Sequence, residues 1–204
     1  SSRRRHTRYI SVTGVQTCAL PISENVETAK KIIAKYPAGR QQSALLPLLD
    51  LAQRQIGGWL PRAAMDHVSA FLGLAPIRVY EVATFYTMFN LRPIGRHHVQ
   101  VCTTTPCWLR GSDQVLEACK HKLGVDAGET TPDGMFTLSE VECLAACVNA
   151  PVAWIGDDFY EDLDGPAMTK LLDDVAAGKA KPGPQVKRQT SAPVSGAKTL
   201  KKGA

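Results

Sequence analysis

The chain has 204 residues, an ordinary hydrophobic share of 44% and a formal net charge of +5. This length allows one substantial core with a small second domain, and no apolar run approaches the roughly 18 residues needed to cross a bilayer. The positive charge lies at the two ends, because residues 1–22 and 178–204 hold 11 of the 24 basic residues and no acidic ones. Residues 23–177 therefore hold 13 basic and all 19 acidic residues, a net charge of −6. The central part therefore lacks the basic face with interleaved aromatic residues that nucleic-acid binding needs.

The first 22 residues are set apart by their sequence. Residues 12–22, VTGVQTCALPI, resemble the translation of a common sequencing-adapter oligonucleotide, so we interpret residues 1–22 as a non-native, disordered leader. A disordered basic leader belonging to the protein is the alternative. On either interpretation this segment, with Cys18, contributes nothing to the predicted fold.

Residues 23–92 have the pattern of a small helical bundle. Apolar residues recur at one-face spacing from Val26 to Tyr36, and proline and glycine mark the junctions that follow. Pro61 and Pro76 are expected to open two of the helices, since a missing N–H is tolerated in a first turn. The four predicted helices cover roughly residues 23–36, 43–56, 61–72 and 76–86.

Residues 93–178 are predicted to form an α/β domain, because strand and helix patterns alternate along them. In chain order the predicted elements are a strand (98–102), a helix (112–123), a strand (135–138), a hairpin (151–161) and a final helix (165–177). Residues 179–204 are rich in Lys, Pro, Gly and Ser, and we expect them to form a disordered basic tail.

Four cysteines form two pairs that follow predicted strands: Cys102 and Cys107 with spacing C-x4-C, and Cys143 and Cys147 with spacing C-x3-C. Two thiolates from each pair can therefore face a common point. No secretory signal is recognisable, and in a reducing compartment clustered cysteines bind metal or do redox work more often than they form disulfides. Wide pairs of this kind favour a [2Fe–2S] cluster, in which each pair holds one of two irons.

Three alternatives stay open on spacing alone. A structural zinc site also uses four cysteines, although its short loops are usually C-x2-C. A dithiol redox site would have C-x-x-C at the start of a helix, which is missing. Disulfides or free thiols are the third alternative. The cysteine runs of plant-type and four-iron ferredoxins are absent from the sequence.

Three segments carry a resemblance to a known family: VCTTTPCWLRGS at 101–112, GETTPDG at 128–134 and EVECLAACVNAP at 140–151. VYEVATFY at 79–86 and YEDL at 160–163 match as well. The chain resembles, over about residues 24–182, the thioredoxin-like [2Fe–2S] ferredoxin subunit of NADH:quinone oxidoreductase, respiratory complex I. This resemblance implies a thioredoxin-like [2Fe–2S] domain at 93–178 after the helical bundle at 23–92. It also implies that the cluster ligands are Cys102, Cys107, Cys143 and Cys147.

The same resemblance implies the role of the chain. It would be a non-catalytic electron-transfer subunit of an NADH dehydrogenase, docked on the FMN- and NADH-binding subunit and other peripheral-arm subunits. The expected place is the cytoplasmic side of the bacterial inner membrane, or the matrix side in mitochondria. No nucleotide-binding loop and no acid–base pair is found in the sequence, so no catalytic residue is assigned. Alternatives are the equivalent subunit of an NAD-dependent formate dehydrogenase or NAD-reducing hydrogenase, and a zinc-stabilised binding module.

Several single residues carry further expectations. The family commonly has Gly where this chain has Ala145, and a positive φ there would strain the loop by roughly 1 kcal/mol. Cys119 lies on the apolar side of a predicted helix and is expected in the core.

The threonines at 103–105 either donate hydrogen bonds to cluster sulfurs or simply suit a turn. Trp108 either covers the cluster from water or belongs to a partner interface. The acidic Glu142 is expected to lower the cluster potential, or else only to solvate the surface.

Overall fold

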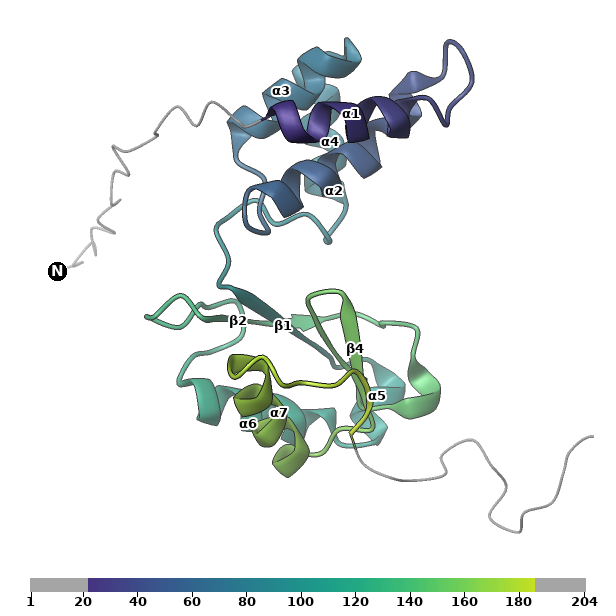
Figure 1. The fold of residues 1–204 in the computed structure, drawn as a ribbon. Helices are drawn as coiled ribbons and strands as arrows, with labels where there is room; N and C mark the ends of the chain where they lie inside the picture. Colours follow the sequence, from purple (N-terminus) through teal and green to yellow (C-terminus); the bar gives the residue numbers. More distant parts are fainter. Residues whose placement is uncertain (1–21, 186–204) are drawn as a thin grey trace, which may run out of the picture. The chain divides into compact units, whose positions relative to one another are not determined.

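The computed structural model describes residues 22–185, which divide between Arg92 and Pro93 into a helical unit and an α/β unit (Figure 1). Most of the predicted leader and the tail from residue 186 onward lie outside the described residues. None of the helices in the described part is long and apolar enough to cross a membrane.

The helical unit consists of α1 (Ile22–Ile33), the 3-10 helix η1 (Gln41–Ala44), α2 (Leu45–Gln55), α3 (Arg62–Leu72) and α4 (Pro76–Phe85). The helix predicted at 43–56 is therefore in two parts, with Pro47 in the first turn of α2, where no helical hydrogen bond is broken. Pro61 is the N-cap of α3 and not its first residue, and Gly73 ends that helix with a left-handed φ of 63°. One apolar cluster from all four α-helices, including Leu49 and Val79, forms the core of this unit.

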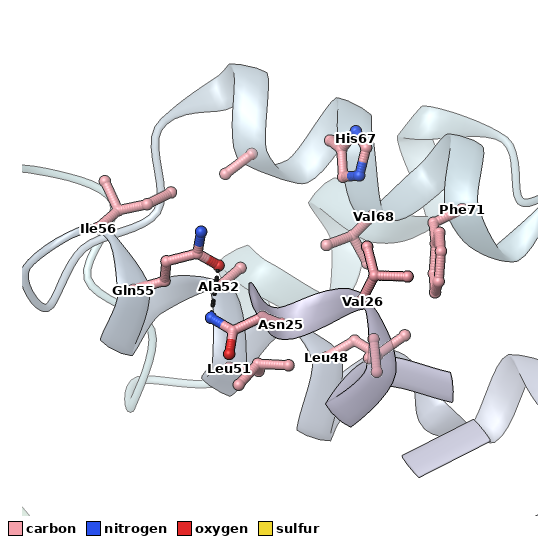
Figure 2. A pocket seen from close by; sticks show the side chains of 12 residues that line it. Asn25, Val26, Leu48, Leu51, Ala52, Gln55, Ile56, His67, Val68 and Phe71 are labelled. Carbon is pink, nitrogen blue, oxygen red and sulfur yellow. Dashed lines mark hydrogen bonds between the residues drawn. The ribbon is translucent and has the colours of Figure 1, made fainter. Parts of the chain in front are cut away.

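A pocket opens between α1, α2 and α3 of the helical unit (Figure 2). Its walls are mostly aliphatic and aromatic, and the polar residues among those lining it are Asn25, Gln55 and His67. The Asn25 Nδ2 donates to Gln55 Oε1 at 2.9 Å, so these two amides satisfy one another across the pocket. The cysteine pairs all lie in the other unit.

The α/β unit is built on a sheet of strand order β2-β1-β3-β4-β5 in the described residues. Its elements are β1 (His97–Cys102), α5 (Thr105–Leu109), α6 (Ser112–Leu123), β2 (Phe136–Val141), the 3-10 helix η2 (Cys147–Asn149), β3 (Ala153–Ile155), β4 (Asp158–Glu161), α7 (Gly165–Ala176) and β5 (Gly183–Pro184). The observed α6 has the predicted bounds. The predicted α/β class is confirmed.

Helices α6 and α7 pack side by side against one face of this sheet (Figure 1). Val99 and Val101 of β1 are fully buried on that face, while Gln100 between them is half-buried, as expected for alternating strand residues. The crossover between the parallel strands β1 and β2 contains α5 and α6, as a parallel connection requires. Gly95, just before β1, is tightly enclosed, because a Cβ there would lie 2.8 Å from the Phe136 carbonyl carbon.

Two parts of this unit differ from the prediction. Strand β5 pairs in parallel with β4 through Tyr160 and Gly183, so the segment from residue 179, expected to be disordered, contributes a strand to the sheet edge. The short helix α5 also forms where the sequence predicted only a loop between Cys102 and Cys107. Backbone pairing with an existing strand edge stabilises β5, a contribution that composition does not reveal.

Candidate metal centre

The first cysteine pair is built into the end of strand β1 and the helix α5. Cys102 is the last residue of β1, and Cys107 lies within α5; their exposed fractions are 1% and 2%. The Cys102 N–H donates to the Val152 carbonyl oxygen at 3.1 Å, and the Thr103 N–H donates to Val141 at 3.3 Å. The sheet therefore fixes this loop from both neighbouring segments.

The second pair lies in the loop after β2 and is open to solvent. Cys143 and Cys147 are both exposed, and their Sγ atoms are 3.4 Å apart. That separation far exceeds the roughly 2.05 Å of a disulfide, and both cysteines are free thiols. Between them Ala145 has a left-handed φ of 60°, which turns its N–H toward Cys143 Sγ at 3.4 Å.

The sheet brings the two pairs together. Cys102 pairs with Val141 at the carboxyl ends of the parallel strands β1 and β2, so both loops leave the sheet at the same end. There Cys102 and Cys107 form a small apolar cluster with Ala150 and Val152, separate from the main core. Leu144 and Ala146 of the second loop pack against this cluster, which joins the two loops in one site: Cys102, Cys107, Cys143 and Cys147.

The four thiols influence one another's protonation. Burial acts to raise the pKa of Cys102, but hydrogen bonds from the side chain and backbone of Thr104 and from the Leu144 backbone outweigh it, and its pKa is lowered. Burial and the Cys102 thiol raise the pKa of Cys107 to about 12. The Ala145 N–H and the Cys147 thiol lower the pKa of Cys143, and donation to Cys143 raises the pKa of Cys147. Each pair thus has one thiol that favours the thiolate and one that keeps its proton.

Within residues 22–185 no group of three or more His, Cys, Asp or Glu side chains converges as one metal ion would require. The short contact between sulfurs is instead made within a pair, between Cys143 and Cys147. Two pairs of thiolates are the donor set of a two-iron cluster, in which each iron takes two protein ligands.

Comparison with known proteins decides the family. The sequence profile described as thioredoxin-like [2Fe-2S] ferredoxin matches residues 29–176. The chain belongs to this family. The predicted resemblance is therefore confirmed, and the family's cofactor is a [2Fe–2S] cluster, whose thiolate chemistry the four cysteines fit.

The chain is also similar to two curated relatives and to one solved structure. It is 61% identical over 150 residues to the E subunit of NADH-quinone oxidoreductase from Rickettsia conorii, a match that covers 74% of this chain and 90% of that protein. It is 56% identical over 178 residues to NADH dehydrogenase [ubiquinone] flavoprotein 2, mitochondrial, of Dictyostelium discoideum, covering 87% of this chain and 72% of that protein. The crystal structure of an air-oxidised NAD+-reducing [NiFe]-hydrogenase shares the fold, with a TM-score of 0.57 and 20% identity over 66% of this chain and 23% of that one.

A network after the second loop was not predicted. The Asp162 N–H donates to the Asn149 carbonyl oxygen at 2.7 Å, and Asn149 Nδ2 donates to Glu161 Oε2 at 2.7 Å. Asp162 is 3% exposed and has a left-handed φ of 52°, which Asp tolerates better than most residues. Burial raises the pKa of Asp162, and the charge of Arg110 opposes that rise. The end of β4 therefore anchors the segment that follows Cys147.

The remaining expectations have clear outcomes. Ala145 does adopt a positive φ, so the strain expected from its missing glycine is present. Cys119 is fully buried in the main core, where burial raises its pKa to about 12. Trp108 is 60% exposed in the described chain.

Proposed function

We propose that Cys102, Cys107, Cys143 and Cys147 hold one [2Fe–2S] cluster, and that the chain is the electron-transfer ferredoxin subunit of an NADH:quinone oxidoreductase. The observation that carries the first part is the meeting of two thiol pairs at one end of the parallel β1–β2 pair. The 61% identity over 90% of the Rickettsia conorii protein supports the second part.

The bound cluster supplies one-electron chemistry, accepting one electron and passing it on. The protein supplies an asymmetric shell around it. Cys102 and Cys107 are buried in apolar surroundings that exclude water from one side. Cys143 and Cys147 are exposed, so the second loop is the side from which a redox partner approaches.

Exposed apolar residues follow both cysteine pairs. Val148, directly after Cys147, is 66% exposed, and Trp108 and Leu109, directly after Cys107, are 60% and 71% exposed. Each pair is thus followed at once by exposed apolar side chains, and we take these as the surface that a partner covers. We assign this surface to the FMN- and NADH-binding subunit, whose flavin exchanges an electron with the cluster. We further place the chain in the peripheral arm, on the cytoplasmic side of the bacterial inner membrane or the matrix side of mitochondria.

The test separates the chain from its partner. The full chain, purified anaerobically, should not be reduced by NADH when it is alone, because its sequence has no nucleotide-binding loop. Addition of the FMN-binding subunit of a related NADH dehydrogenase should allow NADH to produce the EPR signal of a reduced [2Fe–2S] cluster. Reduction by NADH without a partner, or no reduction with one while dithionite does reduce the cluster, would contradict the proposed role.

The fold likeness to the hydrogenase supports one second candidate, the equivalent subunit of an NAD-reducing hydrogenase or of an NAD-dependent formate dehydrogenase. At 20% identity that likeness concerns the fold alone. Complex formation with an FMN-binding subunit from each class, compared by co-purification, distinguishes these candidates. A colourless protein containing zinc would instead support the zinc-stabilised binding module.

A further inference from the structure

One hydroxyl in the first loop lies against the cysteine sulfurs. Thr104 is the N-cap residue of α5, yet its side chain makes no capping hydrogen bond to that helix. Its Oγ1 lies 3.3 Å from Cys102 Sγ, within hydrogen-bond distance for sulfur. The hydroxyl is therefore directed at a sulfur and not at the helix it precedes.

The neighbouring threonines are occupied differently. Thr103 Oγ1 donates to Glu140 Oε1 at 2.6 Å, which ties the first loop to strand β2. Thr105 is exposed at the first position of α5. Of the three threonines, Thr104 is the one whose hydroxyl contacts a cysteine sulfur in the described part of the chain.

We propose that the Thr104 hydroxyl donates a hydrogen bond to the thiolate ligand Cys102 and raises the midpoint potential of the cluster. This inference rests on the proposed function, since it requires that Cys102 ligates an iron. A ligating thiolate carries no proton, so the hydroxyl must be the donor. Reduction adds one electron and one negative charge to the cluster, and a donor to its sulfurs stabilises that state more than the oxidised one. Thr104 is thus a positioning residue that tunes the potential without touching the irons.

The experiment compares four versions of the full chain: wild type, Thr104→Val, Thr104→Ser and Thr105→Val. Valine has nearly the shape of threonine and removes only the hydroxyl, serine restores it, and Thr105→Val removes a hydroxyl from the adjacent residue. Each protein is purified anaerobically, assayed for iron, and titrated with dithionite while the EPR signal is followed. We expect Thr104→Val to lower the ratio of reduced to oxidised cluster roughly threefold to tenfold at a fixed potential, where tenfold corresponds to about 59 mV for one electron. Thr104→Ser and Thr105→Val should stay close to wild type.

An unchanged potential in Thr104→Val, or an equal shift in Thr105→Val, would overturn the inference. Thr104→Ala provides a second variant without the hydroxyl if the valine protein takes up little iron. Loss of iron from both, with Thr104→Ser fully loaded, would place the hydroxyl in cluster assembly and would also overturn the inference as stated. Wild-type protein that holds no iron would instead contradict the proposed function itself.

Discussion

The two cysteine loops, to which the proposed function assigns the same chemical task, have different structural support. The first loop is held by the sheet and by α5, and both of its cysteines are buried. The second loop is exposed, contains a non-glycine residue at positive φ, and depends on contacts made after Cys147. In the proposed site the fold would therefore preform one half, and bound irons would complete and stabilise the other half.

Cys143→Ala should abolish cluster binding and destabilise the α/β unit. The irons join the two loops across the 35 residues between Cys107 and Cys143, which is worth about 4 kcal/mol if the cluster acts like a covalent cross-link. Iron content and denaturant unfolding of wild type and variant measure the effect. The helical unit should unfold as before, because its core contains no cysteine.

Cys119→Ala is the matched control for that experiment. It also removes a thiol from the α/β unit, but from the main core, so the variant should keep its iron. Equal unfolding of the wild-type protein with and without iron would contradict the cross-linking role of the cluster.

In the iron-free protein the exposed loop should react first with an alkylating reagent. The thiolate is the reactive form, and the pKa is lowered at the exposed Cys143 but raised to about 12 at the buried Cys107. We expect Cys143 to be labelled roughly tenfold faster than Cys107 or more. As the pH falls, labelling of Cys143 should persist to lower pH than labelling of Cys147, whose pKa is raised. Peptide mass spectrometry after short pulses of iodoacetamide measures this order, and faster labelling of Cys107 than of Cys143 would contradict it.

Ala145→Gly should stabilise the exposed loop. An L-residue at a φ of 60° carries strain that glycine does not, so we expect a gain of about 1 kcal/mol and slower loss of iron to a chelator. Ala146→Gly is the matched control, because Ala146 has an ordinary φ of −104° and its replacement should lower stability by roughly 0.5–1 kcal/mol. Changes of the same sign in the two variants would show that the backbone of Ala145 is unstrained.

Glu142→Gln should have the smallest effect. Glu142 is exposed beside Cys143, so removing its charge should raise the midpoint potential by roughly 20 mV or less, because water and salt screen it. Titrations at low and high ionic strength, followed by EPR, measure the shift, which should shrink as salt is added. An unchanged potential at low salt would leave Glu142 a merely solvating residue.

Much of this architecture was predictable from local patterns. Proline and glycine placed the helix boundaries of the helical unit, and the apolar side of residues 112–123 gave α6 with its observed bounds. Helix α5 was missed because five residues offer too few apolar positions to show a period, although Pro106 in its first turn was a usable signal. Strand β5 was missed because two residues in a Lys- and Pro-rich segment become a strand only through pairing with β4.

The sequence predicted which four cysteines form the candidate site, but not that one pair is buried and the other exposed. Spacing identified the two pairs, but not that Cys102 and Cys107 pack in a small apolar cluster while Cys143 and Cys147 stay exposed. The positive φ of Ala145 was expected from the family's glycine at that position. The positive φ of Asp162 and its backbone hydrogen bond to Asn149 were not expected, because they arise from contacts between separate segments.

The most direct test of the whole account is the inorganic content of the full chain purified without oxygen. Two irons and two acid-labile sulfides per chain, with an EPR signal that appears on reduction by dithionite, are the predicted result for four thiolates around a [2Fe–2S] cluster. A stoichiometric zinc ion with neither iron nor sulfide would contradict it.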